Sequence, residues 1–142
     1  MRRRDPKADE LGRLKLFRSC RPRELRMLAL IAEDVRFKPG SLICEEGHHG
    51  YECFVIESGE AEVVIGDLQV AIVGRGDVVG EMAIVDGGPR TASVVALTDV
   101  HAFSIERRRF DSLLECAPAI ARAMLRQLST RLRHLDEELQ AV

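Results

Sequence analysis

The chain is 142 residues long, with 46% hydrophobic and 31% charged residues and a formal net charge of −2. This length and balance are typical of one globular domain, and the scarcity of aromatic residues predicts an aliphatic core. The near-neutral charge excludes a general electrostatic attraction to nucleic acid. The sequence shows no apolar run of about 18 residues and no signal-peptide pattern, so we expect a cytoplasmic protein without a membrane span.

Two helices are predicted at the start of the chain. Residues 8–18 place Leu11, Leu14 and Phe17 among charged residues at helical spacing. A second helix is expected to begin at Pro22, because proline suits the first helical position and the following apolar residues recur with a helical period. We therefore expect residues 1–34 to form a helical part.

The middle of the chain has the pattern of β-structure. Short runs rich in β-branched residues are separated by glycines roughly every eight to ten residues, as in a sandwich or barrel. The pairs Pro39-Gly40 and Ser58-Gly59 are each expected to reverse the chain between two strands. The predicted strands are 35–38, 41–44, 53–57, 60–65, 68–73, 78–79, 92–96 and 101–105.

Helical patterns return after Ile105. The basic run 107–109 opposes the helix dipole, and we interpret it as a solvated helix start or as a functional contact. Pro118 is expected to kink or restart the helix. Spacings of three and four residues then form a heptad seam of about two heptads, which leaves two alternatives, a lid on the β-structure or a dimer interface. The seam residues are Leu125, Leu128, Leu132, Leu135 and Leu139.

Residues 80–94, GEMAIVDGGPRTASV, combine features that suit a small phosphosugar. A helical turn over 81–85 would offer free backbone N–H groups to an anion, and Gly80 would let that anion approach closely. Arg90 carries a planar fork of donors that matches phosphate oxygens. Glu81 stays a hydrogen-bond acceptor at neutral pH and suits a sugar hydroxyl.

This stretch resembles the phosphate-binding cassette of cyclic nucleotide-binding domains. The shared pattern is Gly-Glu, two or three apolar residues, a short bend, Pro-Arg, then Ser/Thr/Ala-Ala, and it matches without insertion or deletion. Phe37-x-Pro-Gly and Glu46-Gly47 are similar to the β-roll of the same family, so the resemblance covers most of residues 25–130. It also implies that Gly59 marks the turn before the strand that faces the cassette.

The resemblance implies a mainly β fold with flanking helices in one domain, 1–142. An eight-stranded, jelly-roll-like β-roll (35–105) would carry a short cassette helix between N-terminal helices (1–34) and C-terminal hinge or lid helices (106–142). It implies a non-enzymatic regulatory sensor that binds cAMP, or less favourably cGMP, and requires no other cofactor. Glu81 would hold the ribose 2′-hydroxyl and Arg90 the cyclic phosphate. The expected ligand-binding residues are Gly80, Glu81, Met82, Ala83, Arg90 and Thr91.

The resemblance and the amphipathic last helix together predict that ligand binding moves the helices after Ile105. Arg131, Leu132 and Leu135 are the candidates for closing over the base. The expected partners are the cyclic nucleotide and, through the last helix, a second copy of the chain. A transcription factor of the cyclic-AMP-receptor class would need a helix-turn-helix beyond Val142, so we expect a stand-alone sensor or the sensor portion of something longer, without direct nucleic-acid binding.

Two alternatives belong to other functional classes. The first is a metal site, drawn either as Cys44, His48, His49 and Cys53 or as a cupin-like enzyme motif of the two histidines with Glu52. Adjacent histidines point to opposite faces of a strand and no second histidine motif follows, which weighs against a cupin. The four cysteines, with no C-x-x-C pair, are interpreted as free buried thiols. The second alternative is a β-roll without ligand that serves as an interaction module.

Overall fold

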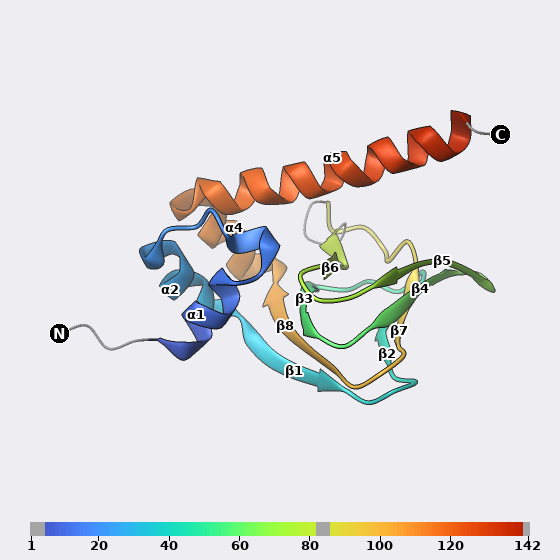
Figure 1. Cartoon of the computed structure of the whole chain (residues 1–142), viewed down its shortest axis with the longest axis horizontal. Helices are drawn as coiled ribbons and strands as arrows, with labels where there is room; N and C mark the ends of the chain where they lie inside the picture. Colours follow the sequence, from blue (N-terminus) through green and yellow to red (C-terminus); the bar gives the residue numbers. More distant parts are fainter. Residues whose placement is uncertain (1–4, 82–85, 141–142) are drawn as a thin grey trace.

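The computed structural model describes residues 5–81 and 86–140, except for the side chains of Leu135 and Glu138. Two antiparallel four-stranded sheets form a β-roll, and helices from both ends of the chain gather beside it (Figure 1). Residues 82–85 of the predicted cassette turn, which include Met82 and Ala83, lie outside the described residues.

The chain crosses repeatedly between the two sheets, with only β4 and β5 of the described strands consecutive in one sheet, which makes the fold jelly-roll-like. The strand orders are β1-β8-β3-β6 and β2-β7-β4-β5, and every pairing is antiparallel. All eight predicted strands are confirmed, each within two residues of its predicted bounds. The strands are β1 (Glu33–Phe37), β2 (Leu42–Cys44), β3 (Glu52–Ser58), β4 (Ala61–Ile65), β5 (Leu68–Val73), β6 (Val78–Val79), β7 (Ser93–Ala96) and β8 (Val100–Glu106).

The two predicted reversals depend on glycine. Gly40 has a φ of 85° and Gly59 a φ of 92°, a region that residues with a Cβ rarely enter. A side chain at Gly59 would also overlap the backbone carbonyl of Asp99. Gly59 is therefore required twice over, by its own conformation and by the loop that packs against it.

The N-terminal part contains α1 (Pro6–Gly12), the 3₁₀-helix η1 (Lys15–Phe17) and α2 (Pro22–Ile31). The Asp5 side chain caps α1 by accepting hydrogen bonds from the backbone N–H groups of Lys7 and Ala8. The prediction of one helix over 8–18 was wrong in its extent, because the chain becomes extended at Leu14, where ψ is 136°. Pro22 begins α2 as predicted.

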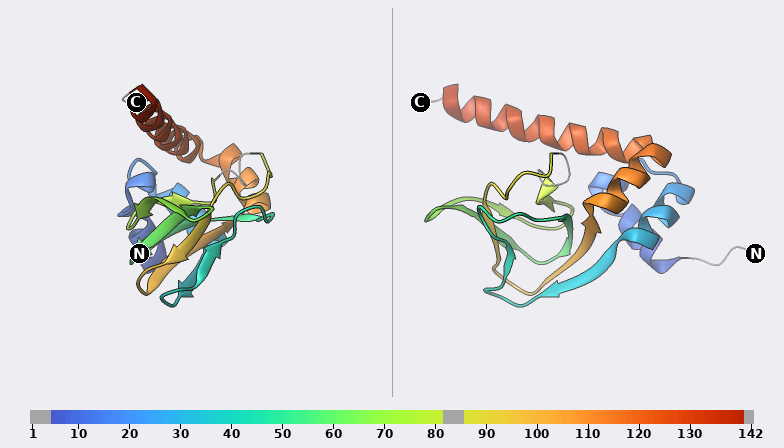
Figure 2. Two further views of the ribbon diagram at one scale, coloured as in Figure 1. Left: turned by 90° about the vertical axis from the view of Figure 1, so that its right-hand side faces the viewer. Right: turned by 180° about the vertical axis from the view of Figure 1, so that it is seen from behind.

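Two helices follow β8, namely α4 (Arg107–Cys116) and α5 (Pro118–Gln140), and Pro118 restarts the helix as predicted. The beginning of α5 packs through Ile120, Ala123 and Met124. Figure 2 shows the rest of α5 running along the β-roll, with its C-terminal end far from the N-terminal helices. None of the described helices combines the length and the apolar character that crossing a bilayer requires.

Strand β3 separates two hydrophobic cores. Cys53 and Val55 face the helices and pack in the core that includes Phe17, Leu28 and Ile120, whereas Phe54 and Ile56 face the second sheet. This alternation follows from the two-residue period of a strand. The first core fixes the start of α5 to the β-roll, so it also sets where the rest of α5 lies.

Candidate functional site

A cavity of about 480 Å³ lies between the second sheet and α5. Its apolar wall comes from β4 to β7 and includes Val63, Val70, Val73 and Val94. Four predicted ligand-binding residues and one predicted lid residue line it on the polar side, together with a histidine that was not predicted. These polar-side residues are Gly80, Glu81, Arg90, Thr91, Arg131 and His134.

Arg90 is 7% exposed, and its guanidinium lies in space between Gly50 and Gly80. A Cβ at Gly50 or at Gly80 would overlap its guanidinium, and Gly80 also has a φ of 78°. Arg90 Nη1 donates to the Gly80 carbonyl at 3.2 Å, and Nη2 lies 3.6 Å from Glu52 Oε1. A guanidinium has five N–H donors, so these contacts leave donors for an anion in the cavity.

The backbone of Arg90 is also fixed, by two hydrogen bonds to the loop before β3. Its N–H donates to the His48 carbonyl at 2.9 Å, and its own carbonyl accepts from the Gly47 N–H at 2.9 Å. His49 and Pro89 form a β-bridge beside this pair. The loop between β2 and β3 therefore fixes the segment that carries Arg90.

Glu81 is also 7% exposed, and it is bound by a residue far away in the sequence. Arg131 of α5 donates from Nη1 to Glu81 Oε1, and from Nη2 to the Val78 carbonyl at 2.7 Å. Burial lowers the pKa of Arg131 and the nearby Asp77 carboxylate opposes that effect, but an arginine stays charged at neutral pH. The ion pair thus connects α5 directly to the first acidic residue of the cassette.

The structure separates the lid candidates from one another. Arg131 lines the cavity, whereas Leu132 is 63% exposed and does not line it. The Leu135 side chain lies outside the described part of the chain. His134, one helical turn from Arg131, lines the cavity, and no sequence pattern had distinguished it.

Two further residues beside the site were missed from the sequence. Gly50 was not distinguished from the other glycines that separate the β-rich runs, and Glu52 was considered only as part of a cupin-like motif, yet both contact Arg90. The basic run reaches the segment between Glu81 and Arg90, because a Cβ at Gly87 would overlap the Arg107 guanidinium. The spacing of these residues carries no signal for these contacts, which depend on the folded chain.

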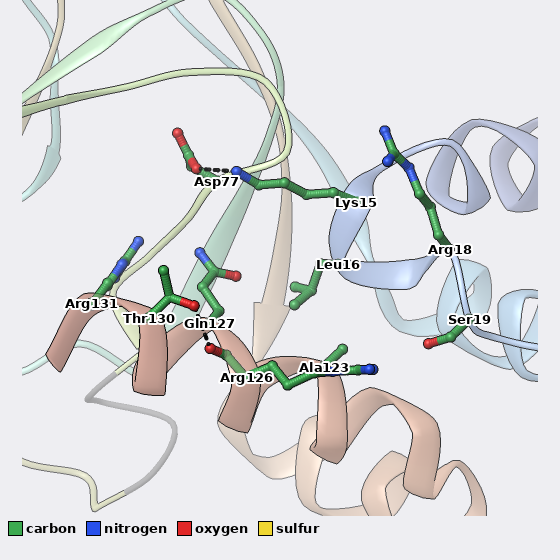
Figure 3. Close-up of a pocket in the computed structure, with 10 residues that line it drawn as sticks. All are labelled: Lys15, Leu16, Arg18, Ser19, Asp77, Ala123, Arg126, Gln127, Thr130 and Arg131. Carbon is green, nitrogen blue, oxygen red and sulfur yellow. Dashed lines mark hydrogen bonds and ion pairs between the residues drawn. The ribbon is translucent and has the colours of Figure 1, made fainter. Parts of the chain in front are cut away.

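A second cavity of about 490 Å³ lies between η1 and α5, and Arg131 lines both cavities (Figure 3). Lys15 in its wall is already paired with Asp77 at 2.9 Å. Figure 3 shows the side chains of Arg18 and Arg126 extending in different directions rather than toward one point. This second cavity therefore presents no converging set of donors like that around Arg90.

The described residues do not support the alternative of a zinc site in the loop before β3. Burial raises the pKa of Cys44 to about 11 and that of Cys53 to about 12, and the His48 side chain is exposed beside Glu45. These residues do not meet as a group of metal-type ligands in the part of the chain described. All four cysteines are free, but the expectation of burial holds only for Cys44 and Cys53, since Cys20 is half-buried and Cys116 is exposed on α4.

Comparisons with known proteins agree with this geometry. Residues 34–116 match the family model of the cyclic nucleotide-binding domain. A cAMP-dependent protein kinase regulatory subunit from Colletotrichum orbiculare is 34% identical over 116 residues, which cover 80% of this chain and 30% of the relative. A CRP-like cAMP-activated global transcriptional regulator from Mycobacterium tuberculosis is 32% identical over 136 residues, covering 91% of this chain and 60% of the relative.

Solved structures show the same architecture. The catabolite activator protein of Thermus thermophilus superposes with a TM-score of 0.81 at 27% identity, covering 89% of this chain and 62% of that one. The N-terminal domain of a transcriptional regulator from Streptomyces coelicolor superposes with a TM-score of 0.71 at 28% identity, covering 92% and 95%. The chain belongs to the cyclic nucleotide-binding domain family. It spans less than two thirds of the length of the two curated relatives described above.

Proposed function

We propose that this chain, as one regulatory domain over residues 1–142, binds cAMP in preference to cGMP and acts as a non-enzymatic sensor. One observation carries the proposal: a buried arginine with spare donors and a buried glutamate line the same cavity. A cyclic nucleotide offers an anion and a ribose hydroxyl at a fixed separation, which suits that pair. The preference for cAMP rests on the relatives, whose names refer to cAMP.

Each part of the nucleotide has a proposed partner. The cyclic phosphate binds Arg90, Thr91 and the backbone N–H groups at Gly80, Met82 and Ala83, of which the last two lie outside the described residues. The ribose 2′-hydroxyl donates to Glu81. The base lies against the aliphatic wall, where burial of its faces contributes through the hydrophobic effect.

The ion pair between Glu81 and Arg131 provides the proposed route of transmission. In the free state Arg131 binds one oxygen of the Glu81 carboxylate, and in the bound state the ribose hydroxyl joins it on that carboxylate, so the contacts of α5 differ between the two states. Such a difference is what allows a ligand to shift an equilibrium between two arrangements. Arg131 is the foremost of the three lid candidates, and Leu132 and Leu135 would reach the base only after α5 moves.

We also propose a homodimer through α5. Leu125, Leu132 and Leu139 are exposed by 65%, 63% and 73%, and they recur at intervals of seven residues, so they form one stripe. A second copy supplies a matching stripe, and seven-residue apolar spacing is the pattern of paired helices. We call these three residues the α5 stripe.

Calorimetric titration of the whole chain with cAMP and with cGMP tests the proposed ligand. Arg90→Leu should weaken cAMP binding by roughly 2–4 kcal/mol, because it leaves the phosphate charge without its buried partner. Arg122→Leu, which removes an exposed arginine from α5, is the matched control and should leave the affinity unchanged. Equal affinities for Arg90→Leu and the unaltered chain would contradict the assigned role. An absence of binding for both nucleotides would favour the interaction module.

A further inference from the structure

A second group of chemically active side chains lies away from the nucleotide cavity. Glu10 on α1, Glu57 on β3 and His101 on β8 meet on the side of the first sheet that packs against the helices. The His101 side chain is 11% exposed, and its ring contacts the Phe103 ring with centroids 5.3 Å apart. These three residues come from distant parts of the sequence, so only the fold brings them together. None of them has a part in the proposed nucleotide site.

The three side chains present ligand atoms to one point. His101 Nδ1 lies 3.0 Å from Glu57 Oε2 and 3.9 Å from Glu10 Oε1. All three ligand atoms lie within 4.8 Å of one another. Ligands of a tetrahedral zinc ion, with bonds near 2.0–2.1 Å, are separated by about 3.3 Å. Small side-chain movements would therefore place all three atoms on a single ion.

The surrounding contacts are those of a ligating histidine. The other ring nitrogen, Nε2, lies 2.7 Å from Asp34 Oδ1, and Lys7 Nζ approaches the same carboxylate at 3.9 Å. A metal-binding histidine usually donates its second N–H to a carboxylate, which fixes the ring and leaves the first nitrogen free to ligate. Arg75 Nη1 holds the remaining oxygen of Glu57 at 3.0 Å.

One proton on His101 Nδ1 cannot form a hydrogen bond with both Glu10 and Glu57. The Glu10 and Glu57 carboxyl groups have oxygens within 4.8 Å of each other, and two carboxylates this close are stabilised by a proton or a cation between them. One imidazole N–H can donate along one direction only, toward Glu57, and it leaves Glu10 at the longer distance. A divalent cation would contact all three ligand atoms at once.

The geometry points to a divalent transition-metal site, of the zinc class, formed by Glu10, Glu57 and His101, with Asp34 orienting the histidine. One nitrogen and two carboxylate oxygens form a ligand set that suits Zn²⁺. Bound there, the ion would join α1 to β3 and β8, and so fix the N-terminal helix to the β-roll.

Titration of the metal-free whole chain with ZnCl₂ at pH 7, followed by calorimetry and by thermal unfolding, tests the site. We expect one equivalent of Zn²⁺ to bind and to raise the unfolding temperature. Glu10→Gln and His101→Gln should each lower the affinity at least tenfold and remove the temperature shift. Asp34→Asn should lower the affinity about 10–100-fold, because Asp34 acts through the histidine. His48→Gln, at an exposed histidine beside Glu45, is the control and should bind as the unaltered chain does.

The design keeps the site testable if one variant does not fold. Glu10→Gln keeps the shape of the side chain and leaves the sheet unaltered, so it decides the question if His101→Gln is unfolded by circular dichroism. Undetectable Zn²⁺ binding would overturn the inference. Binding that survives in Glu10→Gln, or that is lost in His48→Gln, would overturn it too, because the ion would then lie elsewhere.

Discussion

The guanidinium of Arg90 occupies a space that exists only because two glycines lack side chains. Gly50 precedes β3 and Gly80 follows β6, so two separate parts of the chain leave this space open. The result is a buried cation with a defined direction and few protein partners. Because the Arg90 side chain is already ordered before an anion binds, binding costs little conformational entropy, which favours affinity.

Gly50→Ala tests this arrangement without replacing any charged residue. Its Cβ would overlap the Arg90 guanidinium, so the arginine must move or the backbone must shift. We expect weaker cAMP binding and a loss of stability of about 1–3 kcal/mol, the usual cost of overpacking. Calorimetry and urea unfolding measure the two effects. In Gly74→Ala the new Cβ meets its nearest atom at an ordinary 3.5 Å, so that variant should change neither quantity by a comparable amount.

At the scale of single residues, the sequence predicted the two charges of the site but not their surroundings. Glu81 and Arg90 could be found because they belong to one ordered motif of consecutive residues. The contact of Glu81 with Arg131 and the cluster around His101 could not, since each joins residues from distant elements. Such pairs depend on how strands and helices pack, and a single sequence contains no pattern for that.

The elements themselves were easier to predict, for a physical reason. The strands are short and end at glycines such as Gly40 and Gly59, whose positive φ ends one strand and directs the next. The predicted helix over 8–18 failed, because apolar residues at helical spacing occur both in α1 and in η1, and spacing does not reveal the extended residue between them. Local conformation there is set by packing rather than by propensity.

Helix α5 presents two different faces. Ile120, Ala123 and Met124 attach its beginning to the core, and Arg131 contacts Glu81. The α5 stripe is exposed, so the contact of Arg131 with Glu81 and a dimer contact can coexist on different faces of one helix. The two alternatives left open by the heptad seam therefore do not exclude each other.

Leu132→Glu tests the α5 stripe. A charge in the middle of the stripe should disfavour pairing, because it would have to be buried or left unpaired between two helices. We expect the unaltered chain to sediment as a dimer and the variant as a monomer at the same concentration. Leu30→Glu alters an exposed leucine on α2 and should remain dimeric. A monomeric unaltered chain at about 100 μM would rule out a stable dimer of the isolated domain.

For the molecule as a whole, cysteine thiols removed from water are expected to make the free energy of unfolding depend on pH in the alkaline range. Burial raises the pKa of Cys53 to about 12 and the pKa values of Cys20 and Cys44 to about 11, from an ordinary value of 9.0. Each folded-state pKa exceeds that of the unfolded chain, so the neutral thiols contribute stability below pH 9 that is lost as the pH rises toward about 11 for Cys20 and Cys44 and toward about 12 for Cys53.

We therefore expect the free energy of unfolding to fall as the pH is raised above about 9 under reducing conditions. Urea unfolding at several pH values measures the slope. Cys53→Ala should flatten it, because one buried thiol is removed, whereas Cys116→Ala removes an exposed thiol and should leave the slope unchanged. Identical slopes for all three proteins would show that the buried thiols do not control this dependence.

Because Arg131 and Leu132 are consecutive residues of one helix, they point about 100° apart around its axis. Inserting one residue between Met124 and Arg131 would rotate the guanidinium away from Glu81 by that angle, while the packed start of α5 stayed in place. Inserting a residue after Leu132 would instead leave the ion pair intact and turn Leu139 out of line with Leu125 and Leu132. The length of helix between these points therefore sets the relative orientation of the cavity and the outer surface, whatever side chains it carries.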